Sequence, residues 1–269
     1  MLSDFKIGAQ VTWKQLLISF MNADEYANLE AVERDHWYYA GKRDMVRYWL
    51  NRIGPVQVNQ TLLDCGAGTG IFARELINHC NVFVLDDHEE SIRILRTHFE
   101  ADKILRVSGA SIPLGDSVLD YVTALDVLEH IRDDAAAVKE FRRILKPGGV
   151  AVVTVPASMS LWSDWDVGLH HFRRYDRNGL VSLFHAEQWD VINVNYTNVV
   201  VFPLVWLVRK WRGLRGNHAK NRVQPRTEDV VPPAWLNAIL RTIFVGLGKV
   251  SWFRFPFGVS LILVARRRS

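Results

Sequence analysis

The sequence predicts an α/β protein built on a doubly wound, mainly parallel sheet. Short apolar runs alternate with amphipathic runs of helical period over about a hundred residues, which is typical of βαβ units. The run from Val150 to Val155 is dominated by valine, as expected of a strand covered on both faces. The chain has 269 residues, of which 49% are hydrophobic and 23% charged, so it is long enough for one large domain with an elaboration.

The predicted elements follow in order along the chain. A helix is expected over 24–53, where Tyr26, Trp37 and Trp49 belong to an apolar stripe that Pro55 ends. Alternating strands and helices come next: strands at 61–63, 81–85, 103–107, 119–125 and 150–155, and helices at 71–79, 89–99 and 135–145. The sequence KPGG at 146–149 predicts a sharp turn.

Three further elements and an insertion complete the predicted fold. These elements are a helix at 177–188, a strand at 190–198 and a final strand at 258–265. About 55 residues separate the last two strands, and a structureless loop of that length would be unusual. Helical patterns at 204–211 and 235–252 therefore predict a helical insertion before the last strand. The expected units are an N-terminal helical lead-in (1–56), a core (57–200 and 257–269) and a basic, tryptophan-rich insertion (201–256).

Cysteine usage and the N-terminus indicate a cytoplasmic protein. Cys65 and Cys80 are the only cysteines, so a disulfide framework is not expected. The N-terminus lacks a basic segment followed by an apolar core, so no signal peptide is expected. No run approaches the roughly 18 apolar residues of a membrane span.

The charge is distributed unevenly. From Val199 to the end, thirteen Lys and Arg residues face only Glu228 and Asp229, which suggests an anionic partner for this part. Apolar stretches rich in Trp and Val lie beside the basic residues, as in a helix that binds the surface of an anionic membrane or covers a lipid-like substrate. Two helices that pack on the sheet and expose arginine to water would give the same pattern. A nucleic-acid partner is less favoured, because no RNA-binding module is appended.

The sequence DCGAGTG at 64–70 lies between the first strand and its helix. Glycines at this place let the backbone approach a ligand, and the next helix offers free N–H groups. The spacing is G-x-G-x-G and not the G-x-G-x-x-G of dinucleotide binders, which favours a nucleoside with an amino-acid tail over a pyrophosphate. Asp64 suits an ammonium group, and Asp86, at the end of the second strand, suits two ribose hydroxyls.

Several motifs occur together in order: DCGAGTG at 64–70, VLD at 84–86, GASIPL at 109–114, DVLEH at 126–130 and LKPGG at 145–149. This set resembles the class I S-adenosylmethionine-dependent methyltransferases over roughly residues 60–200 and the last strand. Two elements, EAVERDHWYYAGKR at 30–43 and LWSDWDVGLHHFRRY at 161–175, resemble a bacterial subgroup with E-x-x-H-W and W-S-x-x-D-x(4)-H-x-R-R-Y elements. The resemblance implies a Rossmann-like, seven-stranded sheet with an antiparallel last strand.

The resemblance also implies which residues bind S-adenosylmethionine. Gly66, Gly68 and Gly70 would pack against the cofactor, and Asp86 would bind its ribose. Ala110 stands where such enzymes often carry an Asp for the adenine amino group, and Ser111 is the candidate substitute. The expected cofactor-binding residues are Asp64, Gly66, Ala67, Gly68, Gly70, Asp86, Asp87, Ala110, Ser111, Asp126 and Arg43, the last for the methionine carboxylate.

The segment after the fifth strand carries the candidate catalytic residues His171, Asp166 and Tyr175. A histidine suits a general base, and Asp166 would orient it. A structural cluster that fixes the loop is the alternative. Separately, a run like DVLEH holds a divalent metal in ubiquinone-pathway O-methyltransferases but is also common in metal-free relatives, and no metal ligand is predicted here.

The predicted function is S-adenosylmethionine-dependent O-methylation of a small amphipathic or lipid-linked acceptor. The protein would be cytoplasmic and peripheral on the inner face of the membrane. N- or C-methylation, RNA methylation and a non-catalytic, cofactor-binding regulatory module are the alternatives.

Overall fold

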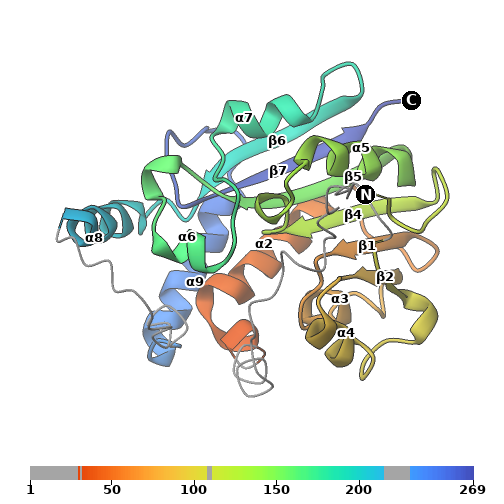
Figure 1. Ribbon diagram of the computed structural model, residues 1–269, viewed down its shortest axis with the longest axis horizontal. Coiled ribbons are helices and arrows are strands. Elements are labelled where there is room, and N and C mark those ends of the chain that lie inside the picture. Colours follow the sequence, from red (N-terminus) through yellow and green to blue (C-terminus); the bar gives the residue numbers. More distant parts are fainter. Residues whose placement is uncertain (1–29, 31, 108–110, 215–230) are drawn as a thin grey trace, which may run out of the picture.

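The computed structural model describes residue 30 and residues 32–107, 111–214 and 231–269. Within them, seven strands form one sheet in the order β3-β2-β1-β4-β5-β7-β6 (Figure 1). The strands are β1 (Thr61–Cys65), β2 (Asn81–Leu85), β3 (Ile104–Leu105), β4 (Leu119–Leu125), β5 (Leu145–Pro156), β6 (Trp189–Thr197) and β7 (Ser260–Arg267). Strand β7 is antiparallel to β5 and β6, whereas the other neighbours are parallel. The predicted doubly wound sheet with an antiparallel last strand is confirmed.

Strand β5 is longer than predicted, because it includes the KPGG segment that was expected to turn. Its pairing with β4 shifts register between Leu119 and Tyr121. Gly148 has a φ of +81°, which side-chain-bearing residues rarely adopt. Residues 146–149 have no partner in β4, so the segment turns out of the ladder as an irregularity within the strand, and only the bounds of the strand differ from the prediction.

The predicted helices lie close to their expected places, and one further helix, Asp164–Gly168, was not predicted. The helices are α2 (Trp37–Ile53), α3 (Ile71–Arg74), α4 (Glu89–Leu95), α5 (Asp134–Ile144), α6 (Asp164–Gly168), α7 (Arg177–Leu183), α8 (Phe202–Leu214) and α9 (Ala234–Gly248), with short 3-10 turns η2 (Ala101–Lys103), η3 (Leu128–His130) and η4 (Met159–Leu161). Helices α3, α4 and α7 end earlier than expected. The first part of the helix predicted at 24–53 falls outside the described residues.

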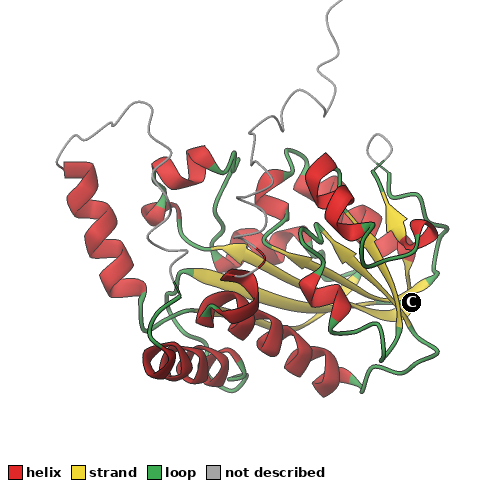
Figure 2. Cartoon of the chain, turned by 90° about the horizontal axis from the view of Figure 1, so that it is seen from below, coloured by secondary structure: helices red, strands yellow, loops and turns green. Residues whose placement is uncertain are grey.

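Two clusters of buried apolar side chains lie against the sheet, with helices on both faces (Figure 2). One cluster contains Phe141 of α5 and Phe184 of α7. The other contains Trp49 of α2, Phe72 of α3 and Ile92 of α4. Each helix thus buries one stripe against the valine-rich central strands, which fixes the strand ends where ligands bind in such folds.

Helix α9 of the insertion packs closely on α2. A side chain at Gly41 would meet Phe244 at 2.7 Å, and Trp49 donates a hydrogen bond from Nε1 to the Gly248 carbonyl at 3.0 Å. Arg241 of α9 also pairs with Asp44 of α2 at 2.6 Å. Helix α8, by contrast, lies to one side of the sheet (Figure 1). In the part of the chain that the structure describes, no helix is both long and apolar enough to span a membrane. The predicted domain boundaries stay a prediction.

Candidate functional site

The glycine turn after β1 presents open space beside a carboxylate. Gly68 has a φ of +56°, and a side chain added there would meet no atom within 4 Å. Its N–H donates to Asp86 Oδ2 at 2.9 Å. Gly66 and Gly70 are close to the protein itself, because side chains there would meet Val127 at 2.5 Å and Leu95 at 2.6 Å. Of the three glycines predicted to face the cofactor, Gly68 is the one with open space before it.

Three carboxyl groups surround this turn. Asp64 is buried, and it accepts a hydrogen bond from Thr123 Oγ1 at 2.8 Å. Burial, followed by the charge of Asp86, raises the pKa of Asp64 to about 7 against that hydrogen bond. Asp86 also accepts from the His88 N–H at 2.9 Å, and burial raises its pKa as well. Glu33 accepts from Thr69 Oγ1 at 2.5 Å, and burial raises its pKa in the same way.

These acids fit a nucleoside ligand that carries a positive charge. Burial raises the pKa of Asp64, Asp86 and Glu33 because it disfavours their ionised forms. A cation bound beside these carboxyl groups would favour the ionised forms again. The open space at Gly68 lets a ligand approach the backbone next to Asp86. The carboxyl groups at these strand ends therefore fit S-adenosylmethionine, which bears a sulfonium, an ammonium group and ribose hydroxyls.

Lys42, and not Arg43, is the cation of α2 at the strand ends. Lys42 pairs with Asp126, which follows β4 and also accepts from Thr154 Oγ1 at 3.0 Å. Arg43 donates to Glu75 at 2.8 Å and to the backbone carbonyls of Glu33 and Arg34. We expected Arg43 to bind the methionine carboxylate. Its guanidinium group is instead occupied by Glu75 and by two backbone carbonyls.

The residues predicted to line the adenine are less completely placed. Ala110 lies outside the described residues. Ser111 is exposed and donates to Glu140 at 3.2 Å, so its hydroxyl already has a protein partner. Asp87 is exposed beside Asp86. The adenine contacts of these residues stay predictions.

The loop after β5 brings Asp166 and His171 together, as predicted. Asp166 lies in α6 and is fully buried. It accepts from His171 Nδ1 at 3.0 Å and from Arg174 Nε at 2.6 Å. Burial alone would raise the pKa of Asp166, but the hydrogen bond from His171 and the charge of Arg174 outweigh it and lower the pKa to about 2. A permanently ionised Asp166 thus fixes the orientation of the His171 ring.

Tyr175 does not join this pair. Its hydroxyl donates to Asp134 at the start of α5, at 2.7 Å, and Arg173 pairs with the same carboxylate at 2.6 Å. Burial and the hydrogen bond to Asp134 raise the pKa of Tyr175. The phenol is therefore part of the packing between the loop and α5, and its expected catalytic role has no geometric support.

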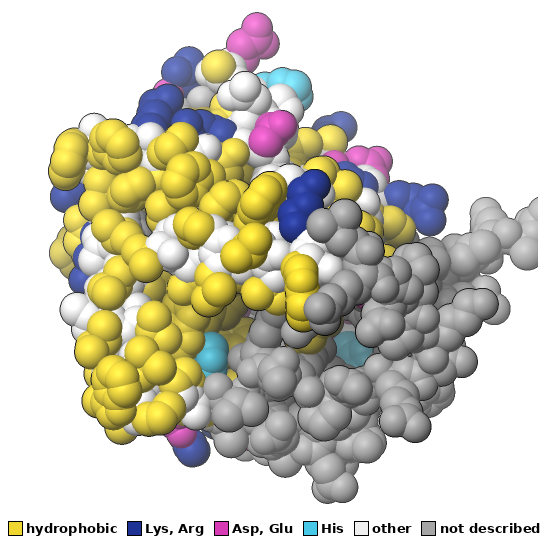
Figure 3. Space-filling model, turned by 90° about the vertical axis from the view of Figure 1, so that its left-hand side faces the viewer, with side chains coloured by type: hydrophobic (Ala, Val, Ile, Leu, Met, Phe, Trp, Pro, Cys, Tyr) yellow, Lys and Arg dark blue, Asp and Glu magenta, His cyan; other side chains and the backbone are white. Residues whose placement is uncertain are grey.

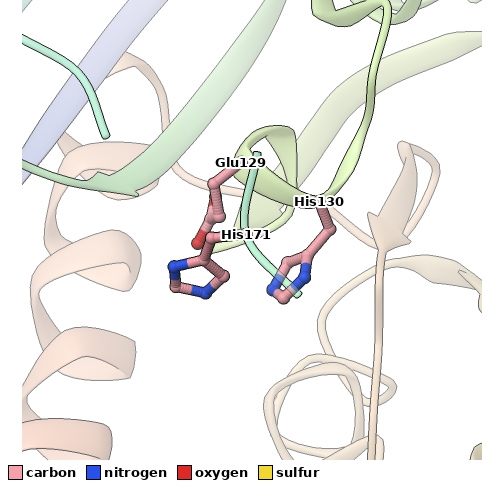
Figure 4. A group of neighbouring side chains, drawn as sticks. All are labelled: Glu129, His130 and His171. Atoms are coloured by element: carbon pink, nitrogen blue, oxygen red, sulfur yellow. The ribbon is translucent and has the colours of Figure 1, made fainter. Parts of the chain in front are cut away.

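His171 also faces the DVLEH segment. The ring centroids of His130 and His171 lie 4.6 Å apart, edge to face. Figure 4 shows the Glu129 carboxyl group beside these two rings. The N–H of Phe172 donates to the Glu129 carbonyl at 2.8 Å, which holds the two segments together. Burial, then the neighbouring His171, lowers the pKa of His130 to about 4, so its ring is neutral at physiological pH.

Glu33 and Lys42 are site residues that sequence reasoning missed. Both lie in the EAVERDHWYYAGKR element at 30–43, which signalled the region but not the individual roles. The helical spacing alone gives no preference between Lys42 and Arg43. The packing of α2 against α9 sets which side of α2 faces Asp126, and therefore which of the two cations reaches that carboxylate.

Comparison with known proteins identifies the type of domain. Residues 63–153 match a family model described as a methyltransferase domain. A probable S-adenosylmethionine-dependent methyltransferase of Mycolicibacterium smegmatis is 29% identical over 164 residues, which cover 60% of this chain and 62% of that protein. A ubiquinone biosynthesis O-methyltransferase of Acinetobacter baylyi is 26% identical over 152 residues, covering 49% of this chain and 62% of that protein. The chain thus spans less than two thirds of the length of these relatives.

Solved structures share the fold. Phosphoethanolamine N-methyltransferase 2 of Haemonchus contortus, in complex with phosphomonomethylethanolamine and S-adenosylhomocysteine, aligns with a TM-score of 0.60. The alignment covers 96% of this chain and 61% of that one at 16% identity, so it speaks for the fold alone. Residues 63–153 thus match a methyltransferase domain, and the chain has the fold of the class I S-adenosylmethionine-dependent methyltransferases.

Proposed function

We propose that this protein transfers a methyl group from S-adenosylmethionine to an oxygen of a small amphipathic or lipid-linked acceptor. The observation that carries the proposal is the open space at Gly68, next to Asp86 and near the raised-pKa carboxyls of Asp64 and Glu33. The cofactor supplies an electrophilic methyl group. Asp86 would accept hydrogen bonds from the ribose hydroxyls of the bound cofactor, and Asp64 would receive its ammonium group.

The protein's part in the transfer is to position the acceptor and to remove its proton. His171 Nδ1 faces the ionised Asp166, so Nε2 is the nitrogen left to accept a proton. The positive charge that His171 gains is stabilised by Asp166. Arg174 keeps that carboxylate ionised in the absence of substrate. Asp126 adds a second negative charge near His171.

An amphipathic acceptor suits the surface beside α2. A shallow hollow with a volume of about 20 Å³ is lined by apolar side chains that include Trp37, Val200, Ile243 and Leu247. Trp37 and Phe244 meet edge to face with centroids 5.8 Å apart, and Tyr38 packs on the same phenylalanine. The Tyr38 hydroxyl lies 3.5 Å from Asp126. Packed aromatic side chains therefore connect this apolar hollow to Asp126 at the strand ends, and these apolar surroundings support an acceptor with an apolar tail.

We further propose that the insertion binds an anionic membrane surface at the cytoplasmic side. Leu204 and Leu207 of α8 are 65% and 60% exposed, and Trp252, after α9, is 86% exposed. Figure 3 shows apolar side chains gathered over this side of the molecule. Three cations close in sequence to these apolar residues are also exposed: Lys210, Lys249 and Arg254. Large apolar side chains beside cations suit the boundary between lipid headgroups and acyl chains.

The direct test is transfer of labelled methyl groups from S-adenosylmethionine into a bacterial lipid extract. A product heavier by one methyl group, with the label on oxygen, supports the proposal. Label found on nitrogen, on carbon or in RNA would contradict the proposed oxygen acceptor and identify a different one. Cofactor binding without transfer to any fraction would favour a regulatory protein without catalytic activity.

A further inference from the structure

We propose that Glu129, His130 and His171 form a binding site for a divalent transition-metal ion, with zinc as the best-suited ion. One ligand atom of each residue lies within 4.8 Å of the others. Glu129 and His130 belong to η3, and His171 belongs to the loop after α6, so the site joins two segments that are distant in sequence (Figure 4). The proposal does not depend on the methyl-transfer reaction.

The Glu129 side chain is the first reason for the proposal. Glu129 is fully buried, and neither carboxyl oxygen has a hydrogen-bond partner among the described residues, apart from contact with its own backbone amide. A buried carboxyl group without partners is costly, and native structures rarely leave one unsatisfied. A bound cation would supply the partner that both oxygens lack.

The two histidines are already oriented as metal ligands are. His171 directs Nδ1 to Asp166 at 3.0 Å, and His130 makes a hydrogen bond to the backbone of Leu169. Metal-binding histidines almost always donate their second N–H to a carboxylate or a backbone carbonyl, which fixes the tautomer and the ring orientation.

The donor set selects the ion class. Two imidazole nitrogens and one carboxylate oxygen suit zinc and its first-row neighbours, whereas magnesium and calcium prefer oxygen ligands. Ligand atoms around tetrahedral zinc lie about 3.3 Å apart, given bonds of about 2.0 Å. The observed spread of 4.8 Å therefore needs only a small closure of the three side chains. Asp126 is not part of the set, because it pairs with Lys42.

Zinc and a proton would compete for the same atom of His171. Its Nε2 lone pair serves either the ion or the proton of an acceptor, since Nδ1 is held by Asp166. Loading with zinc should therefore slow methyl transfer if His171 is the general base. Transfer that rises with zinc would refute the base role of His171 and leave the metal site intact.

The test measures zinc directly on the untagged full chain, stripped with chelator and then reloaded. We expect one zinc per chain by elemental analysis, and Co²⁺ in its place should give visible ligand-field absorption. Glu129→Gln and His130→Asn should each weaken zinc binding at least about 100-fold in competition with a chromogenic chelator. His185→Asn, at an exposed histidine outside the cluster, should bind as the unmodified protein does.

Controls separate a loss of zinc binding from a loss of the folded structure. Each variant is first checked for an unchanged melting profile and for unchanged binding of S-adenosylhomocysteine. If Glu129→Gln fails to fold, His130→Asn alone decides. Absence of stoichiometric zinc in the unmodified protein would overturn the proposal. Equal zinc affinity in His130→Asn and His185→Asn would also overturn it.

Discussion

Lys42 of α2 and Asp126 at the end of β4 form an ion pair that is largely removed from water. The two side chains are 9% and 28% exposed. Burial alone would lower the pKa of Lys42, but the charge of Asp126, followed by Tyr38, raises it. Asp126 has a φ of +57°, so the chain takes an unusual conformation where it meets Lys42. The N-terminal helix is thereby tied to the strand end at which the cofactor is expected.

Replacing Lys42 by Met should leave Asp126 unpaired. We expect the free energy of unfolding at pH 7 to fall by roughly 2–4 kcal/mol, measured by urea titration. The folded-state pKa of Asp126 is lowered, so the stabilisation is present above pH 4 and is lost as pH falls through that pKa. The difference between the two proteins should shrink accordingly in acid. Lys210→Met on α8, an exposed control, should cost little, and equal losses in both variants would contradict the pairing.

Asp64 should make cofactor binding depend on pH. Its pKa is about 7 in the folded protein, so the carboxylate that would meet the ammonium group is largely lost in acid. Between pH 7.5 and 5.5 we expect the affinity for S-adenosylmethionine to fall roughly tenfold or more. Asp64→Asn should bind weakly with little dependence on pH, whereas Asp87→Asn should keep the dependence. A flat profile in the unmodified protein would argue against Asp64 as the ammonium partner.

The raised pKa of Asp64 also predicts a change in stability without ligand. A carboxyl group with a raised pKa in the folded state lowers stability as pH rises from its unfolded value towards 7. Asp64→Asn should therefore melt higher than the unmodified protein at pH 8, with a smaller gap at pH 5. The opposite order would mean that Asp64 is stabilised as the carboxylate.

Of the three residues expected in catalysis, His171 and Tyr175 should differ in their effects. His171→Ala should lower the turnover of the methyl-transfer reaction at least about 100-fold while cofactor affinity stays the same. Tyr175→Phe removes the hydrogen bond to Asp134, so it should cost about 1–2 kcal/mol of stability with little change in turnover per folded molecule. Normal turnover in His171→Ala would leave the Asp166–His171 pair a purely structural role.

Much of the fold follows from the sequence, because alternating apolar runs and turn residues specify strands and helices locally. The limits are physical. The KPGG segment has the composition of a turn and no partner in β4, yet β5 runs through it from Leu145 to Pro156. Lys42 and Arg43 are adjacent on one helix, and only tertiary packing decides which of them reaches Asp126. The approach of His171 to Glu129 depends on a loop whose path no local pattern determines.

Membrane binding should depend on both the apolar and the basic side chains of the insertion. We expect the protein to sediment with vesicles that contain anionic lipid, and less so as salt rises, because headgroup attraction is screened. Leu204→Ser combined with Leu207→Ser should reduce binding several-fold, since both side chains are exposed and apolar. Val58→Ser, an exposed apolar residue in the core region, is the matched control. Equal sedimentation with neutral and anionic vesicles would contradict a contribution of the basic side chains to membrane binding.

Calorimetric titration of the full chain with S-adenosylmethionine and S-adenosylhomocysteine tests the central claim most directly. Both ligands should bind one to one, and Asp86→Ala should weaken both at least about tenfold, because the carboxylate beside Gly68 is lost. A bulky residue at Gly68 should weaken both as well, by filling the open space. No heat with either molecule, while another nucleotide binds at the same turn, would contradict the account.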